Sequence, residues 1–147
     1  MFLGQYRHAI DDKGRLMVPA RYRPLLEQGA YVTQGFDHNL IVLRPKVFES
    51  MSRNVRQLSV TDPKMREYSR QFHANAEFVE LDKTGRILLP QFLRGENSLD
   101  GEAVLVGAGS YFEVWLPSLW DQQRAHLRST QDNAQYFAEL NLTADES

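Results

Sequence analysis

One stretch occurs twice in this sequence: residues 10–19 read Ile10-Asp11-Asp12-Lys13-Gly14-Arg15-Leu16-Met17-Val18-Pro19, and residues 81–90 read Leu81-Asp82-Lys83-Thr84-Gly85-Arg86-Ile87-Leu88-Leu89-Pro90. The match resumes downstream, where residues 40–49 correspond to residues 112–121 and Gly35 corresponds to Gly107. Two separate matches in the same order are not expected by chance, so the chain is built from two copies of one unit. We therefore expect function to lie in what the two copies present together.

Length and composition limit the class of protein. A chain of 147 residues suits one compact domain, or two small units too short to bury separate cores, so we expect the copies to fuse into one body. Its 42% hydrophobic and 24% charged residues are ordinary for a soluble protein, and no apolar run approaches the roughly 20 residues that span a bilayer. No secretion signal is expected at the amino terminus. The lack of cysteine excludes disulfides and thiolate metal sites, and it suits a reducing, cytoplasmic location.

Charge is distributed unevenly along the chain. The net charge is −2, but residues 1–70 carry 12 Lys or Arg against 7 Asp or Glu, whereas residues 71–147 carry 5 against 12. A basic amino-terminal half can neutralise phosphates even in a slightly acidic protein, because charges act over a Debye length of only about 8 Å in physiological salt. A solvated charged surface would give the same count, so charge alone leaves nucleic-acid binding open.

Each copy is predicted to form a strand, a loop, a strand, a short helix, a strand, a turn and a strand. In the first copy, residues alternate between polar and apolar up to Ile10, and the next apolar run stops at Pro19. A short helix is predicted over residues 20–26, followed by strands at residues 31–36 and 40–44.

Helices are predicted after each copy. Apolar residues from Pro45 to Leu58 follow the spacing of an amphipathic helix, and Asp62 with Pro63 begins a second helix that reaches about Phe72. Pro117 begins a third. The fold class is therefore α+β. We expect four segments: residues 1–50 form the first copy, 51–75 the connecting helices, 76–122 the second copy, and 123–147 a C-terminal helix and acidic tail. Part of the last segment, near Tyr136 to Leu140, is also expected to be helical.

The repeated Asp-x-x-Gly-Arg loop carries the candidate chemistry. The aspartate can accept hydrogen bonds from the amides of the turn, and Gly14 or Gly85 supplies a positive φ. At this spacing Asp11 can reach Arg15, and Asp82 can reach Arg86. A carboxylate that holds one edge of a guanidinium orients the remaining donors toward a phosphate or a guanine edge. The same pair would also serve only to pin the turn, and the repeat does not exclude that.

The surroundings of the two loops differ. The second has Lys83 and Arg94 nearby, with Glu77 and Glu80 just before it, so the first loop is expected to be the stronger DNA contact. Lys13 is a candidate for contacting phosphate, and Arg15 for reading a base edge. Our candidate DNA-binding residues are Arg15, Lys13, Arg7, Arg21, Arg23, Arg86 and Lys83.

At these residues the chain resembles the MraZ family, whose two-copy pattern is built around Asp-x-x-x-Arg and is matched here from Asp11 to Arg15 and from Asp82 to Arg86. The resemblance covers nearly the whole chain. It includes the Met-Phe start, the Arg-Tyr-Arg run after Pro19, Leu-Val-Gly at residues 105–107 and Phe-Glu-Val-Trp at residues 112–115. The second copy departs from the first at Thr84, which stands where the first copy has Lys13.

The resemblance implies a pseudo-two-fold, swapped-hairpin β-barrel of the SpoVT/AbrB type, in which two units of one chain replace a homodimer. It also implies ring-shaped homo-oligomers that bind short direct repeats in double-stranded DNA, upstream of the family's own operon for cell division and cell-wall synthesis. The protein would then be a transcriptional regulator, usually a repressor, associated with the nucleoid. No cofactor is expected.

Two other functions were weighed from the sequence. For an enzyme or metal protein, the histidines show no spacing such as His-x-x-x-His and no nucleophile motif, so neither a catalytic nor a metal site is predicted. The alternative is an antitoxin-like or other protein-interaction module, since related folds cap toxins with an acidic tail. Residues 129–147 fit that loosely, but an antitoxin would be expected to carry a single unit.

Aromatic side chains are expected to pack in the core or between subunits, because they lie on apolar strand faces or helix stripes. We expect the helix stripes that follow each copy to join the subunits of the ring. Phe48 and Trp120 are the equivalent anchors in this interpretation.

Overall fold

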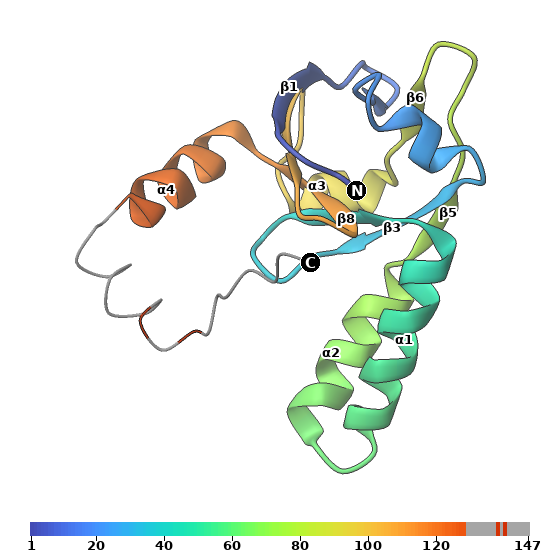
Figure 1. Cartoon of the computed structure of the whole chain (residues 1–147), viewed down its shortest axis with the longest axis vertical. Coiled ribbons are helices and arrows are strands. Elements are labelled where there is room, and N and C mark those ends of the chain that lie inside the picture. The colour runs from blue at the N-terminus through green and yellow to red at the C-terminus, as the bar shows by residue number, and fades with distance from the viewer. Residues whose placement is uncertain (129–137, 139, 141–147) are drawn as a thin grey trace, which may run out of the picture. The chain divides into compact units, whose positions relative to one another are not determined.

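The computed structural model describes residues 1–128, 138 and 140. It divides into two compact units, Met1–Pro117 and Ser118–Ser147. The first unit contains both copies of the repeat and the helices between them (Figure 1). The two copies therefore fold into one body, as the chain length predicted.

The order of elements within each copy is the predicted one. The first copy forms β1 (Gln5–Ala9), β2 (Arg15–Met17), the short 3-10 helix η1 (Arg23–Leu26), β3 (Ala30–Gln34) and β4 (Leu40–Leu43). The second copy forms β5 (Glu77–Val79), β6 (Arg86–Leu88), α3 (Gln91–Glu96), β7 (Glu102–Gly107) and β8 (Tyr111–Trp115). Helices α1 (Pro45–Ser59) and α2 (Pro63–Ala74) lie between the copies. The α+β class is confirmed.

The six-stranded sheet has a symmetric strand order once equivalent strands are matched. The order is β1-β7-β8-β4-β3-β5, with antiparallel neighbours. The first strand of each copy leaves its own copy, because β1 pairs with β7 and β5 pairs with β3. The registers agree as well, since Arg7 faces Val104 and its repeat equivalent Phe78 faces Tyr31. Val104 and Tyr31 hold equivalent places, because they lie opposite Trp115 and Leu43, which are themselves repeat equivalents. The copies are thus related by a pseudo-two-fold axis that passes between β4 and β8.

Strands β2 and β6 form a separate two-stranded sheet across the same axis. Leu16 is paired with its own repeat equivalent, Ile87. Beyond the strands the exchange continues, because the amide of Val18 donates to the carbonyl of Gly85 (3.0 Å) and the amide of Leu89 donates to the carbonyl of Gly14 (2.9 Å). This exchange of backbone hydrogen bonds is consistent with the swapped-hairpin arrangement that the resemblance implies.

One apolar core joins the two copies. It contains fully buried side chains from both, among them Leu16 and Ile87 on the axis. The rings of Phe2, Tyr22 and Phe112 pack together with centroids 5.0, 5.2 and 5.1 Å apart. Each fully buried side chain of this size contributes roughly 1.5–3 kcal/mol relative to exposure, so neither copy is expected to be stable without the other.

Helices α1 and α2 form a hairpin that projects from the sheet (Figure 1). Each begins with proline in its first turn, as predicted, and the Asp62 side chain caps α2 by accepting from the amide of Lys64 (3.0 Å). The buried Phe72 anchors α2 to the sheet, and its carbonyl accepts a hydrogen bond from the hydroxyl of Thr33 on β3 (2.6 Å). This helix ends at Ala74, two residues later than the sequence indicated.

The helix α4 (Pro117–Leu127) begins at the last residue of the first unit, and its other residues belong to the second unit. It confirms the helix expected from Pro117. The predicted acidic tail and the helix near Tyr136 to Leu140 fall almost wholly outside the described residues. Two of our proposed domain boundaries, at residues 50 and 122, fall inside α1 and α4. Within the described part of the chain, no helix is long and apolar enough to cross a bilayer.

Gly14 provides a test of the packing between the copies. Its φ is +86°, and a methyl group at this position would overlap the guanidinium of Arg94 from the other copy. Gly14→Ala is therefore expected to lower the free energy of unfolding by about 2 kcal/mol or more, from left-handed backbone strain and displacement of Arg94. Gly95→Ala is the control, because Gly95 lies in α3 with no atom near its Cβ position. Chemical denaturation should show no loss for this control, and an equal effect of both variants would contradict the prediction.

Candidate nucleic-acid interface

The first loop is a tight turn held by Asp11. The amide of Gly14 donates to the carbonyl of Asp11 (3.0 Å), and the amide of Asp11 donates to the carbonyl of Arg15 (3.0 Å), which closes a three-residue hairpin turn. Asp11 Oδ1 accepts from the amides of Lys13 (3.0 Å) and Arg15 (2.9 Å), and Oδ2 accepts from Arg15 Nε (2.7 Å). The aspartate thus orders both the backbone of the turn and the arginine that leaves it.

The second loop repeats this geometry with one change. Asp82 Oδ1 accepts from the amides of Thr84 and Arg86, both at 2.9 Å, and Oδ2 accepts from Arg86 Nε (3.0 Å). The hydroxyl of Thr84 also donates to Asp82 Oδ1 (2.9 Å). Thr84 therefore adds a contact within its own turn at the position where Lys13 extends from the first turn.

The two loops are joined by an ion pair that breaks their symmetry. Arg86 uses Nε for Asp82 and reaches across the axis with Nη1 to Asp11 Oδ2 (3.3 Å). Arg15 contacts Asp11 through Nε, and among the described residues its two terminal nitrogens have no hydrogen-bond partner. The Arg15 side chain is 34% exposed and that of Arg86 is 26% exposed. Arg15 therefore has more donors available to a ligand than Arg86.

A second pair of arginines packs each loop against the opposite copy. Arg23 Nε donates to the carbonyl of Val18 (3.0 Å), and the equivalent Arg94 Nε donates to the carbonyl of Leu89 (3.2 Å). The guanidinium of Arg23 lies against Gly85, and that of Arg94 lies against Gly14. These contacts give Arg23 a structural role between the copies, while its expected contact with DNA stays a prediction.

The remaining candidate residues occupy different settings. Lys13 and Lys83 are exposed at the two turns. Arg7 on β1 forms an ion pair with Glu102 of β7 (3.2 Å), with both side chains about half exposed. The exposed Arg21 donates through Nη1 to the Tyr6 hydroxyl (3.3 Å). The cations beside the first loop therefore come from both copies: Lys13 and Arg15 from the first, and Arg86 and Arg94 from the second.

Hydrogen bonding keeps both loop aspartates ionised. The backbone amide of Arg86 contributes most to lowering the pKa of Asp82, from 3.8 to about 2, and the pKa of Asp11 is lowered chiefly by the backbone amide of Arg15. The pKa of His8 is also lowered, first by partial burial and then by the charge of Arg23. The loops therefore keep their ion pairs throughout the physiological pH range.

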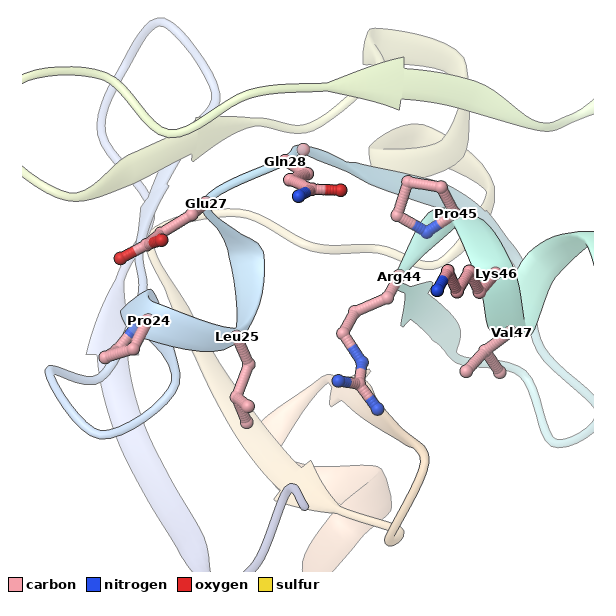
Figure 2. A pocket seen from close by; sticks show the side chains of 9 residues that line it. Pro24, Leu25, Glu27, Gln28, Arg44, Pro45, Lys46 and Val47 are labelled. Atoms are coloured by element: carbon pink, nitrogen blue, oxygen red, sulfur yellow. The ribbon is translucent and has the colours of Figure 1, made fainter.

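A hollow of about 350 Å³ lies between the turn after η1 and the start of α1 (Figure 2). Arg44 extends into it, and its other charged lining residues are Glu27 and Lys46. No Ser, Cys or His is among the residues that line this hollow. Across the described residues, no group of three or more His, Cys, Asp or Glu is placed to bind a metal ion.

The two aromatic residues expected at subunit contacts lie in different units. Phe48 packs within its own subunit, where it stacks on Tyr31 (4.2 Å between ring centroids) and on Phe72 (5.1 Å). Trp120 lies on α4 in the second unit. The packing of Phe48 attaches α1 to the sheet, and its contact with another subunit stays a prediction, as does that of Trp120.

Sequence reasoning found the contacts within each loop and missed those between loops. The spacing of Asp11 and Arg15 indicated a local pair, but nothing in one loop indicates that Arg86 also reaches Asp11. A signal was present for the packing arginines, because Arg23 and Arg94 stand 71 positions apart, like the loops themselves. Their repetition pointed to a shared structural role.

The lowered pKa of Asp82 generates a test by pH. The ionised carboxylate stabilises the folded state, and this contribution is complete above pH of about 4 and is lost as pH falls toward 2. The difference in unfolding free energy between the wild type and Asp82→Asn should be constant at neutral pH and should shrink between pH 4 and 2. Asp12→Asn is the control, since Asp12 has no hydrogen bond among the described contacts, and chemical denaturation at each pH provides the measurement. A difference that does not change with pH would refute this role for Asp82.

Known proteins match the chain over nearly its whole length. The MraZ family model, whose description is that of an antitoxin-like MraZ protein, matches twice, at residues 1–71 and 72–142. A protein named transcriptional regulator MraZ from Roseiflexus sp. (strain RS-1) is 40% identical over 139 residues, 95% of each chain. Proteins of the same name from Desulfitobacterium hafniense (strain DCB-2) and Moorella thermoacetica are 46% identical over 120 residues and 40% identical over 145 residues. These matches cover 82% and 99% of this chain, and 84% and 99% of the two relatives.

The two matches of the family model divide the chain between residues 71 and 72, in agreement with the repeat that the sequence and the strand pairing show. The relatives are named as regulators of transcription and not as enzymes. The chain therefore belongs to the MraZ family.

Proposed function

We propose that this protein is a sequence-specific, DNA-binding transcriptional regulator that acts mainly as a repressor. In this proposal a ring of identical subunits binds short direct repeats upstream of the operon that contains its own gene, an operon for cell division and cell-wall synthesis. The regulator names of the relatives support a role in transcription. Binding to operators would associate the protein with the nucleoid.

The observation that carries this proposal is the state of Arg15. Its Nε is held by Asp11 at 2.7 Å, so the guanidinium is fixed in direction while its two terminal nitrogens have no partner among the described residues. Two parallel donors on a fixed guanidinium match the O6 and N7 acceptors of guanine in the major groove. Lys13, exposed two residues earlier, suits a phosphate contact that positions the loop without reading sequence.

The second loop has a supporting role in this proposal. Arg86 is engaged by Asp82 and Asp11 together, and Thr84 replaces the lysine of the first turn. The acidic Glu77 and Glu80 on the approach to this loop would repel phosphate. We therefore assign the main contact to the first loop and the orientation of both loops to Arg86.

One loop alone would bind DNA weakly. A good bidentate contact to a base discriminates by about 1–3 kcal/mol, whereas specific regulators reach about 4–10 kcal/mol over non-specific binding. Several subunits in one ring supply the difference through effective concentration, provided that the repeats follow the helical turn of DNA. The ring is thus a physical requirement of the proposed function.

The direct test is fluorescence-anisotropy titration against the duplex upstream of the gene, beside a scrambled duplex, at several salt concentrations. Sequence-specific multivalent binding should favour the upstream duplex by about 10³-fold or more, with a salt slope that corresponds to several phosphates. Weak, equal binding to both duplexes would reject the proposal and leave only a basic surface.

Substitutions in the two loops should separate reading from positioning. Arg15→Ala should weaken binding to the upstream duplex by about 10- to 100-fold for each loop engaged, with little change for the scrambled duplex. Lys13→Ala is the matched control, because losing a phosphate contact should weaken both duplexes equally and reduce the salt slope by about one per loop. Unchanged affinity of Arg15→Ala for the upstream duplex, with normal folding, would rule out Arg15 as the reading residue.

A further inference from the structure

Equivalent positions on the outer surfaces of the two copies have opposite chemistry. Arg7, Met17 and Arg21 lie on the first copy, and the positions 71 residues later are occupied by Phe78, Leu88 and Phe92. The equivalence is structural as well, since Arg7 and Phe78 hold the same register in their sheet pairs, as Met17 and Leu88 do in the β2–β6 pair. At two of these positions the first copy carries a cation, Arg7 or Arg21, where the second carries a phenylalanine, while Met17 and Leu88 are both apolar.

The three apolar side chains of the second copy are exposed and form one patch. Phe78 is 48% exposed, Leu88 55% and Phe92 44%. Two adjoining hollows share Glu77, Leu88 and Pro90, with Phe78 lining one and Phe92 lining the other. We call this surface, defined by Phe78, Leu88 and Phe92, the apolar patch. Exposed apolar side chains gathered in this way mark a surface for protein contact.

The border of the apolar patch is acidic on its Phe78 side. There the hollow has a volume of about 250 Å³, and its charged lining residues are Glu77 and Glu80. Two such patches facing each other would bring four carboxylates together, and like charges in a desolvated contact are unfavourable. On the Phe92 side the charged lining residues are Lys13, Glu77 and Arg94, so the acidic border is confined to the Phe78 side. There the patch calls for a partner surface that is apolar and basic.

The free end of the α1–α2 hairpin has these properties. Leu58 is 59% exposed and Val60 is 74% exposed at the end of α1. Residues 56–66 also carry three exposed cations, Arg56, Lys64 and Arg66. Their single carboxylate, Asp62, caps α2. We call residues 56–66 the hairpin tip. With 15 residues, α1 is about 22 Å long, and it carries the tip away from the sheet of its own subunit (Figure 1).

We infer that the apolar patch binds the hairpin tip of a second copy of this chain, with Leu58 and Val60 against Leu88 and Phe78, and with the tip cations facing Glu77 and Glu80. The contact is heterologous, because each subunit offers a tip to one neighbour and a patch to the other. Heterologous contacts generate closed rings when the rotation between subunits closes. This inference rests on the ring of the proposed function, and it names the two surfaces that would build it.

Two variants test the surfaces separately without DNA. The patch variant combines Leu88→Arg with Phe92→Arg, and Phe92→Arg introduces the residue type that the first copy already carries at the equivalent Arg21. The tip variant combines Leu58→Ser with Val60→Ser, at two exposed positions. Light scattering coupled to size exclusion should show a ring for the wild type and the mass of one chain for each variant. Circular dichroism and thermal melting should show that both variants are folded.

Mixing the two variants identifies the contact as heterologous. Each patch variant keeps an intact tip and each tip variant keeps an intact patch, so an equimolar mixture should form a one-to-one dimer and no ring. A charge-reversal pair gives an independent readout. The tip variant supplies the patch of this dimer, and adding Glu77→Lys and Glu80→Lys to it should raise the dissociation constant at least tenfold. The patch variant supplies the tip, and adding Lys64→Glu to it should recover part of the lost affinity.

Each other outcome would overturn the inference in a distinct way. A ring of unchanged mass in the patch variant would show that the patch is not a subunit contact. Loss of the ring in the patch variant alone would point to a different partner surface, such as the basic face of the first copy. Failure of the mixture to dimerise would exclude the heterologous pairing. In all three cases the proposed function would still stand if the wild type forms a ring that binds the upstream duplex. A monomeric wild type would reject the ring itself.

Discussion

The pairing of β2 with β6 is the interaction on which the rest of the first unit depends. Neither strand exceeds three residues, and each finds its partner in the other copy. Loop carbonyls complete the exchange, since Gly14 and Gly85 accept amides from the opposite copy. Because the turns precede these strands directly, the same pairing brings both Asp-x-x-Gly-Arg loops side by side. The contact between Arg86 and Asp11 therefore cannot exist in one copy, and it forms only where the copies have exchanged strands.

Symmetry of the backbone coexists with asymmetry of the side chains, and the asymmetry decides which loop has donors to offer. Asp11 accepts from both arginines, whereas Asp82 accepts from Arg86. A guanidinium shared between two carboxylates has most of its charge compensated and its direction fixed, which suits an organising role. Arg15 keeps its terminal donors, so the pair Arg86–Asp11 stabilises the junction while leaving the first loop able to bind. This division of roles between the two loops cannot arise in a symmetric homodimer, where both loops have the same sequence and the same contacts.

The elements and their order were predictable because their signals are local. Proline at the start of α1 and α2, the Asp62 cap and the repeated glycine turns each depend on a few neighbouring residues. The pairing partners were not predictable from the residues alone, since β1 carries no signal that selects β7 over its neighbour β2. Contacts within a loop, such as Asp11 with Arg15, followed from spacing, but Arg86 with Asp11 required the fold. The packing of Arg23 and Phe48 inside the subunit was hidden for the same reason: their cationic or apolar character was visible in the sequence, and the contacts that use it were not.

Fusion of two units in one chain explains why the outer surfaces could diverge. In a homodimer, a cation at the position of Arg7 would appear on both copies. One copy could then not attract phosphate while the other repelled it. Duplication removes that constraint, so the first copy retains Arg7 and Arg21 while the second carries Phe78 and Phe92 at the matching sites. The shared core restrains only inward-facing residues, such as Leu16 and Ile87, because outward positions contribute little to it. The net charges of residues 1–70 and 71–147, opposite in sign, accord with two different outward surfaces on one symmetric backbone.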